Sequence, residues 1–262
     1  MAHTIYENFV LANEIEDQYN TYLDLARFCT VDNSLVGTPG MIKKINVYTA
    51  TNGTEDLEMG VGNSKDIEVS YTQKDYEIKM SQNRFKYFDE QAMTDDMVVP
   101  TGLRHMATDM FNHINDKIFD EFNKATLTVA LSGNDYFGAF VDAGALLNVE
   151  NLEGVEKFAL INPKDVAKVR KVLKDDFKYV SEFARHGYVS SVADWNLYTC
   201  KLIPEGTIVG GTKDAVTLFN KRGVEVEQDR DGDIRQNTIW SRKYYLAALT
   251  DATKAVKITI GG

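Results

Sequence analysis

Histidines and paired carboxylates are the side chains of this sequence that could bind a metal or carry acid–base catalysis. His105 and His113 share one predicted helix but stand eight residues apart, whereas a helical metal site takes histidines at positions i and i+4. The pairs Asp95-Asp96 and Asp175-Asp176 are consecutive, and adjacent residues on a helix do not face each other. These spacings favour surface histidines and solvated charges, so we predict no catalytic residue and no metal ligand.

Two glycine-containing runs could hold a ligand on composition alone. The run 229–233 (Asp-Arg-Asp-Gly-Asp) has the acidic character of a calcium loop, but its glycine falls two positions early and Trp240 replaces the closing glutamate. The run 206–211 (Gly-Thr-Ile-Val-Gly-Gly) lacks the strand–GxGxxG–helix context of a nucleotide site. We interpret the first as a charged surface turn and the second as a turn between strands. HExxH, GxSxG and phosphate-loop motifs are missing, so no cofactor is expected.

Composition narrows the function classes further. The 262 residues carry 29 basic and 39 acidic side chains, a net charge of −10, which argues against tight general binding to nucleic acid or to an anionic membrane. Cys29 and Cys200 form no CxxC pair and predict two reduced thiols. No apolar run approaches 18 residues, and residues 1–8 lack the basic and apolar regions of a signal peptide. We expect neither a membrane span nor secretion.

The clearest element is a long helix over residues 98–125, about 35–40 Å in length. Apolar side chains recur along it at spacings of three and four, as on the buried face of an amphipathic helix. The main stripe is Leu103, Met106, Met110, Ile114, Ile118 and Phe122, broadened by Ala107 and Phe111. A helix of this length predicts a backbone on which other layers of the fold rest.

Residues 41–88 predict strands with one solvated face, because apolar and polar residues alternate with a period of two. Asn52-Gly53 predicts a hairpin turn, and Gly60 and Gly62 predict a flexible tip. The alternating apolar side chains are Ile67, Val69 and Tyr71, then Tyr76, Ile78 and Met80. Two long strands around a glycine-containing tip predict an extended β-arm, with a plain hairpin inside a sheet as the alternative.

Residues 1–40 predict a short amphipathic helix that ends before the breaker run 37–40 (Gly-Thr-Pro-Gly). Its apolar positions are Leu11, Ile15, Tyr19, Tyr22, Leu25 and Ala26. From the pattern alone an ordinary first helix is favoured, and an arm that packs on a neighbouring subunit is the alternative.

The rest of the chain alternates helices and strands. Residues 137–147 predict a short apolar helix and 158–161 a buried strand. Asn162 and Pro163 predict the cap and first turn of the next helix. Further strands are expected around a turn at Asp194, over 206–227 and over 240–260. Strands, a helix, a mixed region and strands again predict an α+β fold.

This order of elements resembles the major capsid proteins of tailed bacteriophages, which have the Hong Kong 97-like fold. The run 158–163 (Phe-Ala-Leu-Ile-Asn-Pro) before a helix is similar to the strand-to-helix step of that family's A-domain. The segments 186–192, 195–198 and 202–204 resemble its glycine-led strand pair, although Asp194 stands where relatives often have glycine. The run 237–249 resembles its C-terminal strands. The order of these motifs, more than any one of them, supports the resemblance.

The resemblance implies a domain plan for the whole chain. It assigns an N-terminal arm to residues 1–40, an E-loop β-hairpin to 41–88, and a P-domain with the spine helix to 89–136. An A-domain follows over 137–232, and P-domain return strands close the chain over 233–262. The E-loop contains Lys65, Lys74 and Asn63, but nothing identifies a partner for a lysine–asparagine crosslink, and none is predicted.

The resemblance also implies a function. The chain would be a major capsid protein that self-assembles into pentamers and hexamers of an icosahedral head around double-stranded DNA, located in the virion and assembled in the bacterial cytoplasm. Its implied partners are itself, a portal protein, scaffolding or decoration proteins, and packaged DNA held weakly and non-specifically, with no membrane. The implied intersubunit contacts are Gly60, Gly62, Ile67, Val69, Tyr71, Tyr76 and Ile78 in the E-loop and Tyr19 and Tyr22 in the arm. An encapsulin-type shell, a phage tail or baseplate protein and a soluble α+β enzyme are the alternatives.

Overall fold

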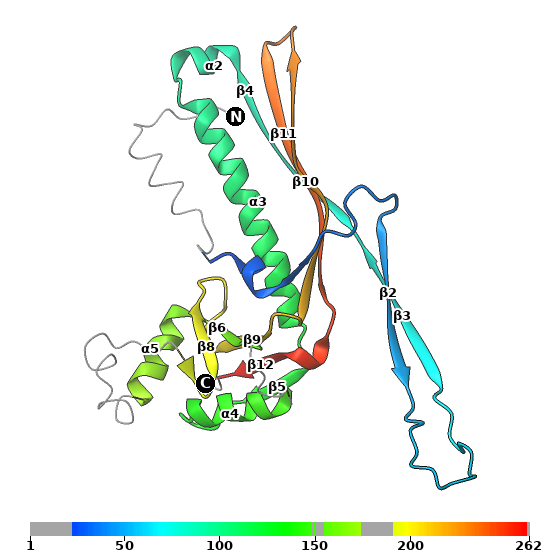
Figure 1. The fold of residues 1–262 in the computed structure, drawn as a ribbon. Helices are drawn as coiled ribbons and strands as arrows, with labels where there is room; N and C mark the ends of the chain where they lie inside the picture. The colour runs from blue at the N-terminus through cyan, green and yellow to red at the C-terminus, as the bar shows by residue number, and fades with distance from the viewer. Residues whose placement is uncertain (1–22, 148, 150–154, 174–190, 261–262) are drawn as a thin grey trace.

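The computed structural model of the protein describes residues 23–147, 149, 155–173 and 191–260 (Figure 1). It combines helices with three sheets, which confirms the α+β class. One sheet has four strands in the order β1-β10-β11-β4, and the second has six in the order β5-β12-β9-β6-β8-β7. The third is a separate two-stranded hairpin, β2-β3, that extends away from both.

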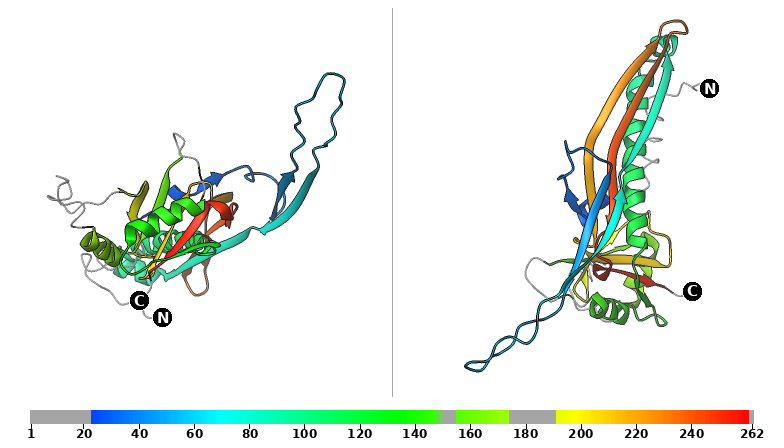
Figure 2. Two further views of the ribbon diagram at one scale, coloured as in Figure 1. Left: turned by 90° about the horizontal axis from the view of Figure 1, so that it is seen from below. Right: turned by 90° about the vertical axis from the view of Figure 1, so that its right-hand side faces the viewer.

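The four-stranded sheet is long and narrow. It consists of β1 (Thr30–Asp32), β10 (Val216–Asp231), β11 (Gln236–Leu249) and β4 (Lys79–Phe88). Strands β10 and β11 form one antiparallel hairpin, whose register shifts between Asn220 and Glu225 bend the ribbon. The short helix α2 (Asp89–Thr94) connects β4 to the long helix α3 (Val98–Asn123). Helix α3 runs along this sheet (Figure 2).

The long helix is where the sequence predicted it. Met106, Met110, Ile118 and Phe122 are buried, as expected for the apolar stripe. Phe111 and Ile114 are half-buried, and Leu103 and Ala107 are exceptions, since both are exposed. The helix also approaches β4 closely: a Cβ added at Gly102 would lie 2.5 Å from the Phe85 ring.

The six-stranded sheet forms the second lobe with helices α4 (Tyr136–Leu147) and α5 (Pro163–Val172). Its strands are β5 (Leu127–Ala130), β12 (Ala255–Thr259), β9 (Thr207–Thr212), β6 (Lys157–Ile161), β8 (Trp195–Thr199) and β7 (Ser191–Val192). The side chain of Asn162 accepts a hydrogen bond from Lys164 N at 2.9 Å, and Pro163 occupies the first turn of α5. This confirms the predicted cap.

A two-residue turn joins β7 to β8. Ala193 and Asp194 both have positive φ, 46° and 69°, between the pairs Ser191–Asn196 and Val192–Trp195. Two residues with positive φ in a two-residue hairpin loop are the mark of a type I′ turn, which favours glycine, asparagine and aspartate. Asp194 therefore occupies a backbone conformation that glycine, asparagine and aspartate favour.

The sheets to which the strands belong divide the chain differently from the domain ranges that the resemblance implies. Residues 79–88 pair with β11 and belong to the four-stranded sheet, so the separate hairpin is shorter than 41–88. Strand β10 lies inside the predicted A-domain range of 137–232 but pairs with β11 in the four-stranded sheet. Strand β12 lies inside the predicted return range of 233–262 but pairs with β5 and β9 in the six-stranded sheet. Alternating apolar residues identify a strand, but they do not identify the sheet it joins.

The glycine run 206–211 is also corrected. Gly210 and Gly211 lie inside β9 and not in a turn. A Cβ at Gly210 would lie 2.5 Å from the carbonyl oxygen of Phe158 and 2.8 Å from the Trp195 ring. Glycine is required here because the buried indole of Trp195 packs directly across the strand.

Replacing Gly210 with alanine is expected to destabilise the subunit by about 1–3 kcal/mol, the usual cost of overpacking a core. The added methyl group would meet backbone atoms of β6, which cannot move without breaking the sheet. Chemical denaturation of the purified protein measures the loss. Gly223→Ala is the matched control, since nothing lies within 4 Å of its added Cβ. Equal stability of the two variants would contradict this packing account.

Candidate functional site

The candidate site is the hairpin formed by β2 (Ile42–Ala50) and β3 (Val69–Glu77). It pairs in antiparallel register from Ile42–Glu77 to Ala50–Val69, and neither strand pairs with any other strand that the structure describes. Both views of Figure 2 show it projecting from the body as a thin ribbon. A two-stranded hairpin alone is marginally stable in water, so its surface is a candidate for contact with another molecule.

One face of this ribbon carries exposed apolar side chains. Tyr48 lies opposite Tyr71, with ring centroids 5.9 Å apart, and Ala50 lies opposite Val69. These pairs are two residues apart along each strand, so they share a face. Tyr48 is 63% exposed, and Val69 and Tyr71 are each 64% exposed. Ile42, at the base of the hairpin, lies on the same face of β2 as Tyr48, because the two are an even number of residues apart, and it is also exposed.

The tip of the hairpin adds apolar side chains to an acidic loop. Leu57, Met59, Val61 and Ile67 are all exposed. The loop 51–68 contains five acidic residues and one lysine. The Glu55 carboxylate organises this loop by accepting hydrogen bonds from Ser64 N at 2.9 Å and Ser64 Oγ at 2.7 Å. These bonds hold the pKa of Glu55 below its ordinary value.

The tight turn of the hairpin is not at Asn52-Gly53, where the sequence predicted it. The chain reverses at the tip, where Val61 N donates to the Glu58 carbonyl at 3.1 Å and Gly60 has a φ of +87°. Gly53 is instead buried and lies close to the returning loop, where a Cβ on it would be 2.8 Å from Ile67 Cγ1. The prediction of a tip at Gly60 is confirmed.

The base of the hairpin is fixed to the four-stranded sheet. Ile78 is only 3% exposed, and its N–H donates to the Met41 carbonyl at 2.7 Å. Tyr76 is half-buried, and its hydroxyl donates to the Leu249 carbonyl at 3.3 Å. Lys43 forms an ion pair with Asp32 at 3.7 Å. Among the described residues, the ribbon is therefore anchored at its base, while Tyr48, Val69 and Tyr71 farther out remain exposed.

The structure groups some of the predicted contact residues and separates others. Val69 and Tyr71 share the exposed face, and Ile67 follows them toward the tip with 61% exposure. Ile78 is corrected: its side chain is buried inside its own subunit and offers no surface to a neighbour. Tyr76 lies on the opposite face of β3 from Tyr71. Tyr19 and Tyr22 lie outside the described residues.

Sequence reasoning missed Tyr48 and Ile42 as members of the exposed face. Tyr48 lies in the range 41–88 predicted as strands, but its partner depends on the register, and the register depends on where the turn lies. Placing the turn at Asn52-Gly53 assigns the wrong partners. A turn at Gly60 would have aligned Tyr48 with Tyr71.

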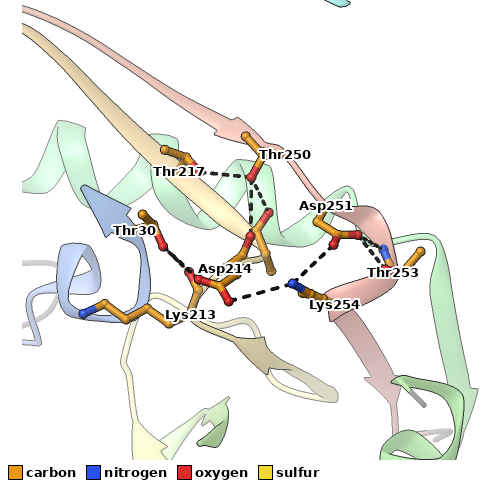
Figure 3. A network of polar contacts seen from close by, with 9 residues as sticks. Thr30, Lys213, Asp214, Thr217, Thr250, Asp251, Thr253 and Lys254 are labelled. Atoms are coloured by element: carbon orange, nitrogen blue, oxygen red, sulfur yellow. Dashed lines mark hydrogen bonds and ion pairs between the residues drawn. The ribbon is translucent and has the colours of Figure 1, made fainter. Parts of the chain in front are cut away.

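A polar junction connects the two lobes (Figure 3). The chain passes between the sheets at residues 213–215 and again at 250–254, and these two crossings lie side by side. Thr250 N donates to the Ala215 carbonyl at 3.0 Å. Lys254 lies between two carboxylates, 3.8 Å from Asp214 and 3.6 Å from Asp251. Thr30 Oγ1 reaches Asp214 at 3.2 Å and so connects the segment before the hairpin to the same junction.

Asp251 caps the short 3-10 helix η2 (Ala252–Lys254) within this junction. Its carboxylate accepts hydrogen bonds from Thr253 N at 3.0 Å and Thr253 Oγ1 at 2.6 Å. Burial raises the pKa of Asp251, but the Thr253 hydrogen bonds and the Lys254 charge outweigh it, so the pKa falls below its ordinary value. The junction therefore favours the ionised carboxylate.

The described residues show no group of three or more histidines, cysteines, aspartates or glutamates that could hold a metal. Residues 229–233 are exposed at the end of the β10–β11 hairpin, which confirms the charged surface turn. Both cysteines are free and buried, and burial raises the pKa of the Cys29 thiol to about 12. None of the described helices is long and apolar enough to cross a membrane.

Comparison with solved structures identifies the fold. A structure from Mycobacterium phage Che8 superposes with a TM-score of 0.72 at 15% identity, covering 98% of this chain and 95% of that one. The capsid of cyanophage P-SCSP1u gives 0.72 at 13% identity, covering 90% and 87%. A virus-like particle from Pyrococcus furiosus gives 0.59 at 12% identity, covering 95% and 96%. With its spine helix, projecting hairpin and two lobes, the molecule has the Hong Kong 97-like capsid fold.

Sequence comparison identifies the family. The sequence model described as "Phage capsid protein" matches residues 71–258. The major capsid protein of Staphylococcus phage phiMR11 is 27% identical over 263 residues, covering 96% of this chain and 92% of the relative. The chain belongs to the phage capsid protein family, and it is a major capsid protein of a tailed phage.

Truncating Ile78 is expected to destabilise the isolated subunit strongly, whereas truncating Tyr71 is expected to change its stability little. Ile78→Ala removes a buried side chain and should lower the free energy of unfolding by about 2–5 kcal/mol. Tyr71→Ser removes an exposed side chain and should leave it within about 0.5 kcal/mol of the parent. Denaturant unfolding of unassembled protein measures both. A large loss for Tyr71→Ser would mean that its own subunit covers the hairpin face.

The lowered pKa of Asp251 predicts a pH-dependent contribution to stability. The contribution is present above the unfolded-state pKa of about 3.8 and is lost as the pH falls through the lower folded-state pKa. Asp251→Asn keeps the cap and removes the charge, so at pH 7 it should cost at most about 1 kcal/mol, because the ion pair is partly exposed. Melting temperatures of parent and variant should converge as the pH is lowered below 3.8. A constant difference at every pH would contradict this account.

Proposed function

We propose that this capsid protein assembles with copies of itself into pentamers and hexamers that close an icosahedral head, and that the β2–β3 hairpin forms the main contact between subunits. The observation that carries the proposal is the exposed face of Tyr48, Val69 and Tyr71 on a ribbon that no described part of its own subunit covers. A neighbouring copy of the chain would bury this face.

The chemistry of the ribbon suits a partner made of protein. Each strand pairs on one edge only, so each has a row of backbone donors and acceptors on the other edge. Apolar side chains lie at the base (Ile42), along the outer half of the ribbon and at the tip, where Met59 is fully exposed. The Lys44–Asp75 ion pair separates Ile42 from the outer apolar residues on this face. Burying them would contribute roughly 25 cal/mol for each square ångström removed from water. Ile67, Val69 and Tyr71 are the predicted contacts that fit this face.

Repetition would turn moderate contacts into a stable shell. In a closed ring each subunit gives its hairpin to one neighbour and receives a hairpin from the other, so the contacts close without a free end. The six-stranded lobe corresponds to the A-domain, which would meet its copies at the capsomer centres. The four-stranded sheet and α3 correspond to the P-domain. Gly60 and Gly62 at the tip would let one sequence fit slightly different neighbours.

The proposal also covers the other partners of this capsid protein and its location in the virion. A head of this kind would enclose double-stranded DNA, and the net charge of −10 supports weak, non-specific contact with it. We infer a portal protein and scaffolding or decoration proteins as further partners. Assembly in the bacterial cytoplasm and residence in the virion capsid follow from this role. A non-enzymatic role is supported by the structural character of the family.

Deleting residues 55–65 tests the proposal. The deletion removes Glu55 together with its partner Ser64, so no half-broken pair remains in the shortened loop. The subunit should keep its circular dichroism spectrum and unfolding transition but fail to form closed particles in negative-stain electron microscopy. Normal particles from this variant would contradict the proposed role of the hairpin.

A matched pair of point variants distinguishes the loss of a contact on the apolar face of the hairpin from a general effect of added negative charge on assembly. Tyr71→Asp places a carboxylate on the apolar face, and Thr72→Asp places one on the opposite face of the same strand. Both positions are exposed in the subunit. Closed particles should be lost with Tyr71→Asp and retained with Thr72→Asp.

A further inference from the structure

The pair Asn52-Gly53 is a feature of the hairpin that neither its tight turn nor its apolar face explains. It is the one asparagine–glycine step in the 262-residue sequence. It lies in the loop 51–68, just beyond the last strand pair, Ala50–Val69, whereas the tight turn is at Gly60. Asn52 is exposed and Gly53 is buried. A dipeptide of this type can modify itself, and its hydrogen bonds decide whether it does.

An asparagine that precedes glycine is open to attack by the next backbone nitrogen. That nitrogen bonds to the side-chain carbonyl carbon, the carbon–nitrogen bond of the side-chain amide breaks, and ammonia leaves with the proton of the attacking nitrogen. Water then opens the cyclic imide at one of its two carbonyl groups and gives either aspartate or isoaspartate. Glycine favours ring closure, because it has no side chain in the path and permits the backbone angles of the ring.

The groups that would react at Asn52 make no competing hydrogen bond. Among the described residues, the Asn52 side chain neither donates nor accepts one, and the Gly53 N–H donates none. The neighbouring backbone is held on both sides. Thr51 N donates to the Glu68 carbonyl at 3.0 Å, and the Gly53 carbonyl accepts from Asn63 Nδ2 at 3.2 Å. The attacking nitrogen and the amide that it attacks are therefore both available.

Asn63 provides the opposite case in the same loop. It is also exposed, but its Nδ2 donates to the carbonyls of Gly53 and Lys65 at 3.2 and 3.0 Å. The next backbone nitrogen, Ser64 N, donates to the Glu55 carboxylate at 2.9 Å. Reaction at Asn63 would have to break these hydrogen bonds, and each one costs free energy to lose. Both asparagines meet water, so hydrogen bonding is what distinguishes them.

We propose that Asn52 is a site of spontaneous deamidation in the folded subunit, with water as the only co-reactant. The product adds a carboxylate to a loop that already has five acidic residues. Isoaspartate also lengthens the main chain by a methylene group beside Gly53, where a Cβ would lie 2.8 Å from Ile67 Cγ1 and 3.0 Å from Ile67 N. The loop must then change shape. The reaction is independent of the hairpin contact, because it involves only this loop and water.

Peptide mapping of the full-length protein by mass spectrometry tests the proposal. The variant Ser64→Gly gives Asn63 the same following residue as Asn52 and keeps the backbone N–H that donates to Glu55. In the folded variant at neutral pH, Asn52 should deamidate about ten times faster than Asn63, because two hydrogen bonds of ordinary net strength account for a factor of that size. The same variant unfolded in denaturant is the control, and there the two asparagines should react at similar rates.

Three results would overturn the proposal. The first is equal or faster deamidation of Asn63 in the folded variant. The second is an unchanged Asn52 in the folded protein over a period in which the unfolded chain reacts. The third is a mass increase of the same peptide that persists in Asn52→Gln, because glutamine would have to close a larger ring and the reaction would then lie at another residue.

Discussion

The structure depends on one constraint: the hairpin carries apolar side chains that the described residues of its own subunit leave exposed. Tyr48, Val69 and Tyr71 lie on a ribbon two strands wide, and a ribbon of that width has no second layer against which to bury them. The fold holds only the base, through Ile78 and Tyr76. A subunit built in this way is incomplete alone, which is what a protein that forms a shell requires.

The remaining elements make the anchored base rigid. Helix α3 and the long β10–β11 hairpin brace the four-stranded sheet from which the ribbon projects. The junction around Asp214, Lys254 and Asp251 connects that sheet to the six-stranded lobe at two adjacent crossings. Glycine at position 210 lets Trp195 pack across the centre of that lobe. The hydrogen bonds and ion pairs of this junction connect the sheet that holds the hairpin to the second lobe.

The sequence predicts the elements of this fold better than their connections. The spacing of apolar residues located α3, and Asn162 with Pro163 located the start of α5. The alternating patterns located strands in β10 and β12 but not their partners, which the structure shows to be β11 for β10 and β5 and β9 for β12. In the site, alternation identified Val69 and Tyr71, but the burial of Ile78 depends on the attachment of the hairpin to the sheet. Gly53 resembled a turn residue because the sequence does not show that Ile67 lies against it.

A cryo-electron microscopy reconstruction of assembled particles, at a resolution that shows side chains, is the most direct test of the central claim. The account predicts that the apolar face around Tyr48 and Tyr71 is buried against a neighbouring subunit at every position in the shell. A closed shell in which the hairpin projects into solvent, with that face uncovered, would contradict it.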